Sequence, residues 1–176
     1  MKRTIAIALF ALGLAAPPPL TGQQFQPPGA TNTDRGTRIG LFGFGVRGGF
    51  DFRGNDQFIA GASLDVGNLF WYRLRLRPSF EIGVFNGSNT YVGSFEALFR
   101  FTDDNQLAQP YLGAGLSLAG QEDCGTIPGC PGVWVNLVFG FELHYRSTFN
   151  WMLEYHGMDL LDRHRFYVGL TTRRGS

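Results

Sequence analysis

Apolar residues alternate with small or polar residues along this chain from Arg38 onward, with a period of two. The first stretch sets Phe42, Phe44 and Val46 on one parity and Gly43, Gly45 and Arg47 on the other. Successive side chains of a β-strand point to opposite faces, so this period predicts strands with one bulky apolar face and one small or polar face. No sustained 3.6-residue repeat competes with it, and we expect an all-β fold.

Eight alternating segments recur in this way, at residues 42–52, 58–67, 73–84, 91–101, 111–118, 133–145, 149–156 and 165–171. Most approach the ~9 to 11 residues that a tilted strand needs to cross a bilayer. Turn residues such as Asn86 to Asn89 separate them. The sequence therefore predicts an eight-stranded antiparallel up-and-down transmembrane β-barrel over residues 37–173.

The apolar face of these strands is predicted to point outward. The chain holds 17 Phe and 25 Gly, and phenylalanines are too bulky for the interior of a narrow barrel, which glycines and long charged side chains fill well. The polar parity also balances its charges, as a desolvated interior requires: Arg47, Arg73, Arg75, Arg77, Arg100 and Arg165 against Asp51, Asp65, Glu81, Glu96, Glu142 and Glu154. With His144 beside Glu142, these residues predict a plugged, salt-bridged interior. The alternative is a soluble barrel with the phenylalanines inside and a small apolar ligand.

The N-terminus predicts export. A basic Met1 to Arg3 precedes the apolar run Thr4 to Ala16, which is too short to span a bilayer and is typical of a signal peptide. We expect a signal peptide over residues 1–22, with its cleavage site left open, and a disordered lead-in over residues 23–36. Export implies an oxidising compartment, so we expect Cys124 and Cys130 to form a disulfide in their Gly/Pro-rich loop; free thiols or half of a metal site are the alternatives.

Three further expectations concern details of the barrel. A periplasmic N-terminus places the connections near Arg53 to Asn55, Asn86 to Asn89, the cysteine loop and Gly157 to Asp162 outside. Pro78 removes one backbone donor, which predicts a bulge near Arg77 and Pro78. Aromatic residues near strand ends form headgroup-level girdles or simply reflect β-propensity: Trp71, Tyr72, Tyr91, Tyr145, Trp151 and Tyr155.

Taken together, residues 38–173 resemble the small bacterial outer-membrane β-barrels, such as the OmpA transmembrane domain, OmpX and OmpW. Arg165 to Leu170 is similar to the insertion signal that the barrel assembly machinery reads, although here Thr172 to Ser176 follow it rather than a terminal aromatic residue. The resemblance implies a bacterial outer-membrane location and contact with membrane lipid and lipopolysaccharide. No basic footprint for nucleic acid is present, because the formal net charge is only +1. No cofactor is expected, and the oligomeric state stays open.

The chemistry of the interior leaves three functions in contention. We expect a structural or surface-interaction barrel and no enzyme. The lipid A deacylase pattern of a His, a Ser two residues later and a downstream acid is met only by His156 with nearby acids such as Glu154, because Met158 holds the Ser position. A narrow pore for small polar solutes is the third reading, since Arg-lined walls favour anions. We expect no metal at His144, His156 or His164, whose spacing is not that of a ligand set.

Overall fold

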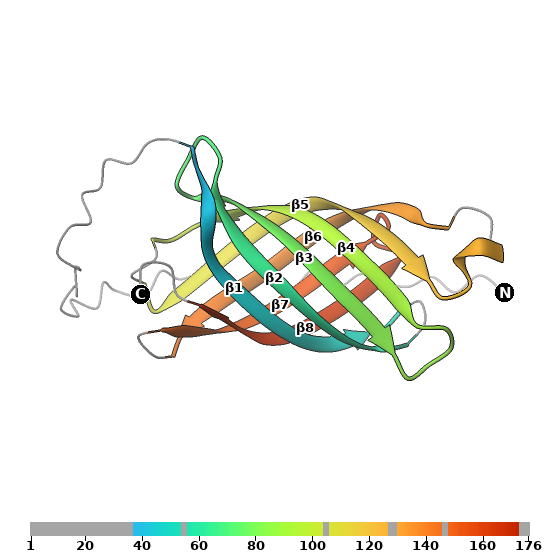
Figure 1. Ribbon diagram of the computed structural model, residues 1–176. Helices are drawn as coiled ribbons and strands as arrows, with labels where there is room; N and C mark the ends of the chain where they lie inside the picture. Colours follow the sequence, from blue (N-terminus) through green and yellow to red (C-terminus); the bar gives the residue numbers. More distant parts are fainter. Residues whose placement is uncertain (1–36, 54–55, 104–105, 127–129, 146–147, 173–176) are drawn as a thin grey trace, which may run out of the picture.

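A closed barrel of eight strands makes up the computed structural model, which describes residues 37–53, 56–103, 106–126, 130–145 and 148–172 (Figure 1). The strands are β1 (Arg38–Asp51), β2 (Phe58–Asn68), β3 (Leu74–Val84), β4 (Thr90–Arg100), β5 (Ala108–Gln121), β6 (Gly132–His144), β7 (Phe149–Met158) and β8 (Arg163–Thr172). Each strand pairs antiparallel with its neighbour in the chain, and β1 pairs antiparallel with β8 to close the barrel. The predicted fold class is confirmed.

The two faces of the strands separate as the alternation predicts. Phe44 on β1 and Phe139 on β6 point outward and expose 53% and 49% of their surface. Arg47 on β1 and Glu96 on β4 point into the lumen, the space that the strands enclose, and expose only 4% and 0%. This arrangement contradicts the alternative of a soluble barrel with an apolar interior.

The two ends of the barrel carry different connections (Figure 1). The β1–β2, β3–β4, β5–β6 and β7–β8 connections lie at one end, here called the loop end, with the short 3-10 helix η1 (Cys124–Thr126) between β5 and β6. The other three connections lie with Arg38 and Thr172 at the opposite end, here called the terminal end. The four connections expected to lie together outside thus gather at the loop end.

The ladders are irregular at two places. Between the pairs Ser63–Ser79 and Gly67–Leu76, β2 contributes one residue more than β3, directly beside Pro78. The β3–β4 ladder runs unbroken through Pro78. The irregularity expected near Pro78 therefore lies on the neighbouring strand, and a second one interrupts the β1–β2 ladder near the start of β1.

Aromatic residues surround the terminal end of the barrel. Trp71 and Tyr72 lie in the β2–β3 connection, and Tyr145 packs on Trp151 with ring centroids 6.0 Å apart. Their exposed fractions range from 44% to 64%, which suits rings placed at headgroup depth. Among the residues that the structure describes, no helix is both long and apolar enough to cross a membrane.

The predicted signal peptide (1–22) and lead-in (23–36) lie outside the described residues, as does the last residue, 173, of the predicted barrel domain.

Candidate functional site in the barrel lumen

Glu154 on β7 lies at the centre of the polar interior. Its Oε2 accepts hydrogen bonds from Arg47 Nη1 on β1 at 2.7 Å and from His156 Nε2 at 3.0 Å. Its Oε1 accepts hydrogen bonds from Arg77 Nη1 on β3 and Tyr111 Oη on β5. One carboxylate thus connects β1, β3, β5 and β7 across the lumen.

A second buried carboxylate, Glu81 on β3, accepts hydrogen bonds from side chains on β1 and β8. Its Oε1 accepts a hydrogen bond from Arg47 Nη2 at 2.5 Å, and its Oε2 accepts one from Arg165 Nη1 at 2.9 Å and one from Tyr167 Oη at 2.7 Å. Arg165 Nε also donates to Asp51 Oδ2 at 3.2 Å. Arg47 therefore bridges Glu81 and Glu154, and each of these buried carboxylates has a cationic partner.

Glu96 on β4 completes the central layer. Arg77 Nε donates to Glu96 Oε2 at 2.9 Å, and its Nη2 lies 2.8 Å from the same oxygen as an ion-pair contact. His156 Nδ1 lies 3.5 Å from Glu96 Oε1, while its Nε2 bonds to Glu154. The imidazole of His156 thus lies between the carboxylates of Glu154 and Glu96.

A separate polar cluster fills the terminal end. Arg100 Nη2 donates to Glu142 Oε1 at 2.7 Å, and Arg100 Nη1 donates to Gln109. Asn150 Nδ2 donates to Glu142 Oε2 at 3.0 Å, and His144 Nδ1 lies 3.3 Å from Asn150 Oδ1. The expected pair of Glu142 and His144 is thus connected through Asn150.

Arg73 corrects the predicted interior. It precedes β3, whose first residue is Leu74, and its Nη2 contacts Asp103 at 3.3 Å with 37% of the arginine side chain exposed. The alternation that placed Arg73 with Arg75 does not extend into the turn. A hydrogen bond to Tyr72 and the Asp103 carboxylate raise the pKa of Arg73 above its ordinary value.

Arg75 and Asp65, two further members of the predicted lumen set, form an ion pair. Arg75 Nη1 is 3.2 Å from Asp65 Oδ2, and the two side chains expose 5% and 22%. Without Arg73, the predicted lumen set has five arginines for six carboxylates. Arg163 adds a positive charge, with its Nη1 4.0 Å from Asp51 Oδ2. His156 Nε2 lies 3.0 Å from Glu154 Oε2.

The loop end of the lumen contains residues that the sequence did not single out. Gln57 Nε2 donates to the carbonyls of Asn86 and Ser88 at 2.6 and 2.8 Å, and Gln57 Oε1 accepts from Thr90 Oγ1 at 2.7 Å. These bonds tie the β3–β4 connection over the lumen. Gln57 shares the inward parity of Ile59, so extending the alternation of β2 back by one residue would have identified it.

An apolar cluster lies in the same part of the interior. Val92, Ala119 and Met158 are buried together, and Trp134 packs against them. These residues lie on the inward parity of their strands, but the prediction of a polar lumen rested on charged residues and did not include them. They fill space that charged groups leave open.

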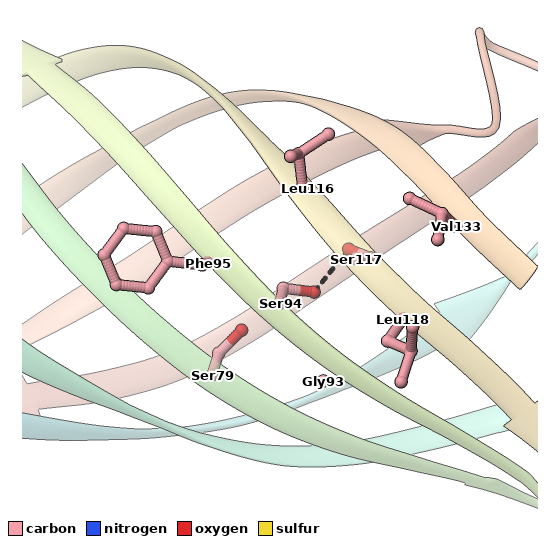
Figure 2. A pocket seen from close by; sticks show the side chains of 8 residues that line it. All are labelled: Ser79, Gly93, Ser94, Phe95, Leu116, Ser117, Leu118 and Val133. Carbon is pink, nitrogen blue, oxygen red and sulfur yellow. Dashed lines mark hydrogen bonds between the residues drawn. The ribbon is translucent and has the colours of Figure 1, made fainter. Parts of the chain in front are cut away.

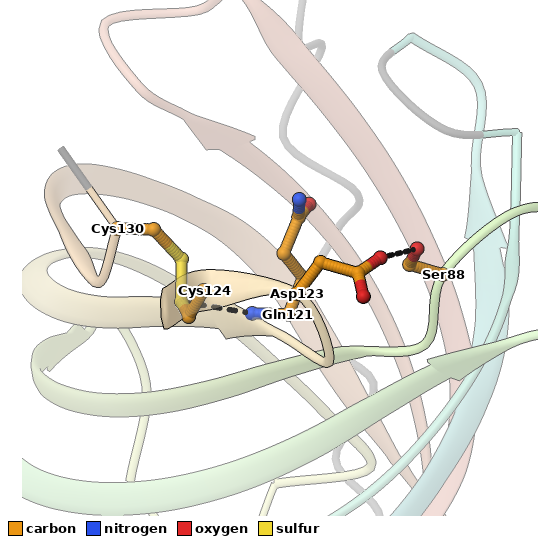
Figure 3. Close-up of a disulfide and its surroundings, with 5 residues drawn as sticks. All are labelled: Ser88, Gln121, Asp123, Cys124 and Cys130. Carbon is orange, nitrogen blue, oxygen red and sulfur yellow. Dashed lines mark hydrogen bonds between the residues drawn. A yellow bond between two sulfur atoms is a disulfide. The ribbon is translucent and has the colours of Figure 1, made fainter. Parts of the chain in front are cut away.

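The β3–β4 and β5–β6 connections are joined to each other at the loop end (Figure 3). Ser88 Oγ donates to Asp123 Oδ2 at 2.6 Å, and Asn89 Nδ2 donates to Glu122 Oε1 at 2.8 Å. The expected disulfide is present as Cys124–Cys130, with a Cα–Cα distance of 5.0 Å. These two hydrogen bonds connect the two loops, and the disulfide closes the β5–β6 loop on itself.

The candidate catalytic pair does not face lipid. His156 and Glu154 are 0% and 1% exposed within the lumen, so their position does not support a role in lipid hydrolysis. His164 instead points to the outer wall, where its Nδ1 lies 2.6 Å from Tyr155 Oη. Among the described residues, no group of three or more His, Cys, Asp or Glu side chains is placed to hold a metal ion.

Solved structures with the same architecture are bacterial outer-membrane barrels and a designed counterpart. The N-terminal β-barrel domain of Pseudomonas aeruginosa OprF matches with a TM-score of 0.57 and 14% identity, over 76% of this chain and 98% of that one. Neisserial surface protein A matches with a TM-score of 0.51 and 13% identity, over 74% and 94%. A de novo designed transmembrane β-barrel matches with a TM-score of 0.51 and 11% identity, over 76% and 96%.

No protein-family model matches the sequence, and no curated protein matches it. At these identities the structural matches establish the fold alone. That fold is the one found in small eight-stranded outer-membrane β-barrels, as the sequence resemblance implies.

Proposed function

We propose that this protein is an outer-membrane barrel with a sealed interior, acting as a structural element that presents a stiffened loop surface outside the cell. The main support for a sealed interior is the bonding of Glu154, which accepts hydrogen bonds from side chains on three other strands across the lumen. In a low-dielectric interior, breaking such pairs leaves unpaired charge, so thermal opening is costly.

The outer wall supports placement in a membrane. Large apolar side chains cover it on all eight strands, with exposed fractions such as 60% for Leu116 and 52% for Val168. In water this surface would be an aggregation hazard, whereas lipid acyl chains cover it at no such cost. The outer membrane is the compartment that the similar solved barrels share.

The loop end supports a role in surface interaction. The bonds from Ser88 to Asp123 and from Asn89 to Glu122, together with the disulfide, hold two neighbouring connections in one arrangement. A surface ordered before binding loses less conformational entropy when a partner docks.

Single-channel recording tests the sealed interior against the pore alternative. Purified wild-type protein in a planar bilayer is expected to show no steady conductance, because ion pairs fill the central layer. A heat-dependent gel shift on the same sample controls for folding. Steady conductance whose ion selectivity reverses in Arg75→Glu would replace the sealed barrel with a pore.

A lipid A hydrolysis assay tests the enzyme alternative. Wild-type protein and His156→Ala are both expected to leave lipid A intact, since His156 is enclosed in the lumen. Deacylation by the wild type that is lost in His156→Ala would overturn the structural role.

A further inference from the structure

A groove interrupts the apolar outer wall toward the loop end of β4, β5 and β6 (Figure 2). It has a volume of about 380 Å³, and its outward walls are the side chains of Phe95, Leu116, Leu118 and Val133. These side chains surround Gly93, which lies at the same level as Leu118 on β5 and Phe80 on β3. The missing side chain at Gly93 makes the hollow.

The space above Gly93 is more open than that above Gly48, Gly120 and Gly157, which also lie on the outward parity of their strands. At Gly157 an added Cβ would lie 2.2 Å from Leu161, so that space is occupied, whereas at Gly48 and Gly120 it would make ordinary contacts with Phe58 at 3.6 Å and Cys124 at 3.4 Å. At Gly93 an added Cβ would meet nothing within 4 Å. No side chain of the described barrel fills this position.

The lining decides what chemistry fits the groove. Its four wall side chains are apolar and expose between 53% and 69% of their surface. The serines behind it are already engaged, because Ser94 Oγ and Ser117 Oγ share a hydrogen bond of 2.6 Å inside the barrel (Figure 2). An occupant therefore gains apolar contact and needs no hydrogen bond, which describes a hydrocarbon chain.

The position of the groove identifies the source of that chain. Gly93 lies three residues after Thr90, the first residue of β4, which is at the loop end. For a tilted strand this distance is roughly 8 Å along the barrel axis. With the headgroups at the level of Thr90, this depth lies within the acyl chains of the leaflet at the loop end. The groove is also continuous with the apolar wall that contacts lipid throughout the barrel.

We propose that the groove at Gly93 holds one acyl chain of a lipid from the leaflet at the loop end, as a site of preferential contact. This inference rests on the proposed placement in a membrane. A chain seated there contacts β4, β5 and β6 at once. A second hollow of about 340 Å³ lies at Gly48 between β1, β7 and β8, where the Phe58 ring lies close to the glycine. The barrel thereby acquires a preferred lipid on one side.

Photo-crosslinking in vesicles tests the proposal. The full chain is reconstituted into phosphatidylcholine vesicles that contain a trace of phosphatidylcholine with a diazirine in one acyl chain, and labelled residues are mapped by mass spectrometry. Labelling of Leu116, Leu118 and Val133 is expected to exceed that of outward leucines on β6 and β7 several-fold. In Gly93→Leu, which fills the groove, that excess is expected to disappear.

Ala60→Leu is the matched control, because it places the same leucine side chain at an exposed outward position on β2, which does not line the groove. It is expected to keep the wild-type pattern. Uniform labelling around the wild-type wall, or an excess that persists in Gly93→Leu, would overturn the lipid site. Protection of these residues from the lipid label in the wild type, together with a dimer mass in detergent solution by light scattering, would replace the lipid with a dimer contact.

The gel shift of each variant separates the two proposals. Folded protein with uniform labelling removes only the preferred lipid contact. Absence of both membrane labelling and a gel shift would instead remove the membrane placement on which it rests.

Discussion

Arg47 donates a hydrogen bond to Glu154 at 2.7 Å, although the two residues are 107 positions apart in the chain. Arg47 lies on β1 and Glu154 on β7, so the contact spans the closure of the barrel between β1 and β8. The same guanidinium reaches Glu81 on β3. The strands are thus held by their backbone ladders at the wall and by ion pairs through the centre.

Removing Arg47 is expected to destabilise the barrel strongly. Arg47→Ala leaves Glu81 and Glu154 each with one cation fewer in a desolvated space, at a cost of about 3 to 5 kcal/mol. Urea unfolding in lipid vesicles, followed by gel shift, measures this loss. Arg73→Ala is the matched control: its exposed pair with Asp103 predicts no measurable change, and equal losses in both variants would contradict the buried network.

The seam that closes the barrel is expected to depend on Gly49. An added Cβ there would lie 1.9 Å from the backbone oxygen of Phe166 on β8, so Gly49→Ala forces β1 and β8 apart. This overpacking is expected to lower the free energy of unfolding by about 1 to 3 kcal/mol. Gly93→Ala meets open space and is expected to fold as the wild type does. Equal destabilisation of the two variants in the same unfolding measurement would contradict the close approach of β1 and β8.

Charge on the outer wall is expected to block insertion. Phe139 is outward and 49% exposed in the middle of β6, so Phe139→Arg presents a guanidinium to the hydrocarbon core. Near mid-bilayer this costs about 2 to 4 kcal/mol. Phe139→Leu keeps the surface apolar and is expected to insert normally. Assembly of Phe139→Arg at the wild-type level would refute the outward orientation of this face.

Loss of the disulfide is expected to affect the loop end and leave the barrel closed. Cys124 and Cys130 enclose a short loop, for which chain entropy predicts a stabilisation of only about 2 kcal/mol. The variant with both cysteines changed to serine should keep its gel shift and gain sensitivity to protease in the β5–β6 connection. Loss of the gel shift would mean that this loop supports the barrel itself.

The alternation of residues was sufficient to predict the fold and most of the lumen. Arg47 and Glu96 were placed inward because side-chain parity in a strand depends only on sequence position. Arg73 was misplaced because parity ends where the strand ends, and the β2–β3 turn, with Phe70 at φ 61°, resets the direction of the chain before Leu74.

The partners within the lumen could not be predicted in the same way. Whether Arg47 meets Glu154 or Glu142 depends on how the strands are staggered around the barrel, and the bulges in the β1–β2 and β2–β3 ladders alter that stagger. Tyr111 and Tyr167 were on the inward parity, but their hydrogen bonds to carboxylates followed only from the closed structure. The hollow at Gly93 likewise depends on which neighbours fill the space around each glycine.

The most direct test of the central claim is gel migration of unheated and boiled protein taken from fractionated membranes. The account predicts that the protein is recovered in the outer-membrane fraction and that the unheated form migrates differently from the boiled form, because a closed barrel with a lipid-facing wall resists detergent until heated. Recovery as a soluble periplasmic protein with no shift on boiling would contradict the outward orientation of the apolar face.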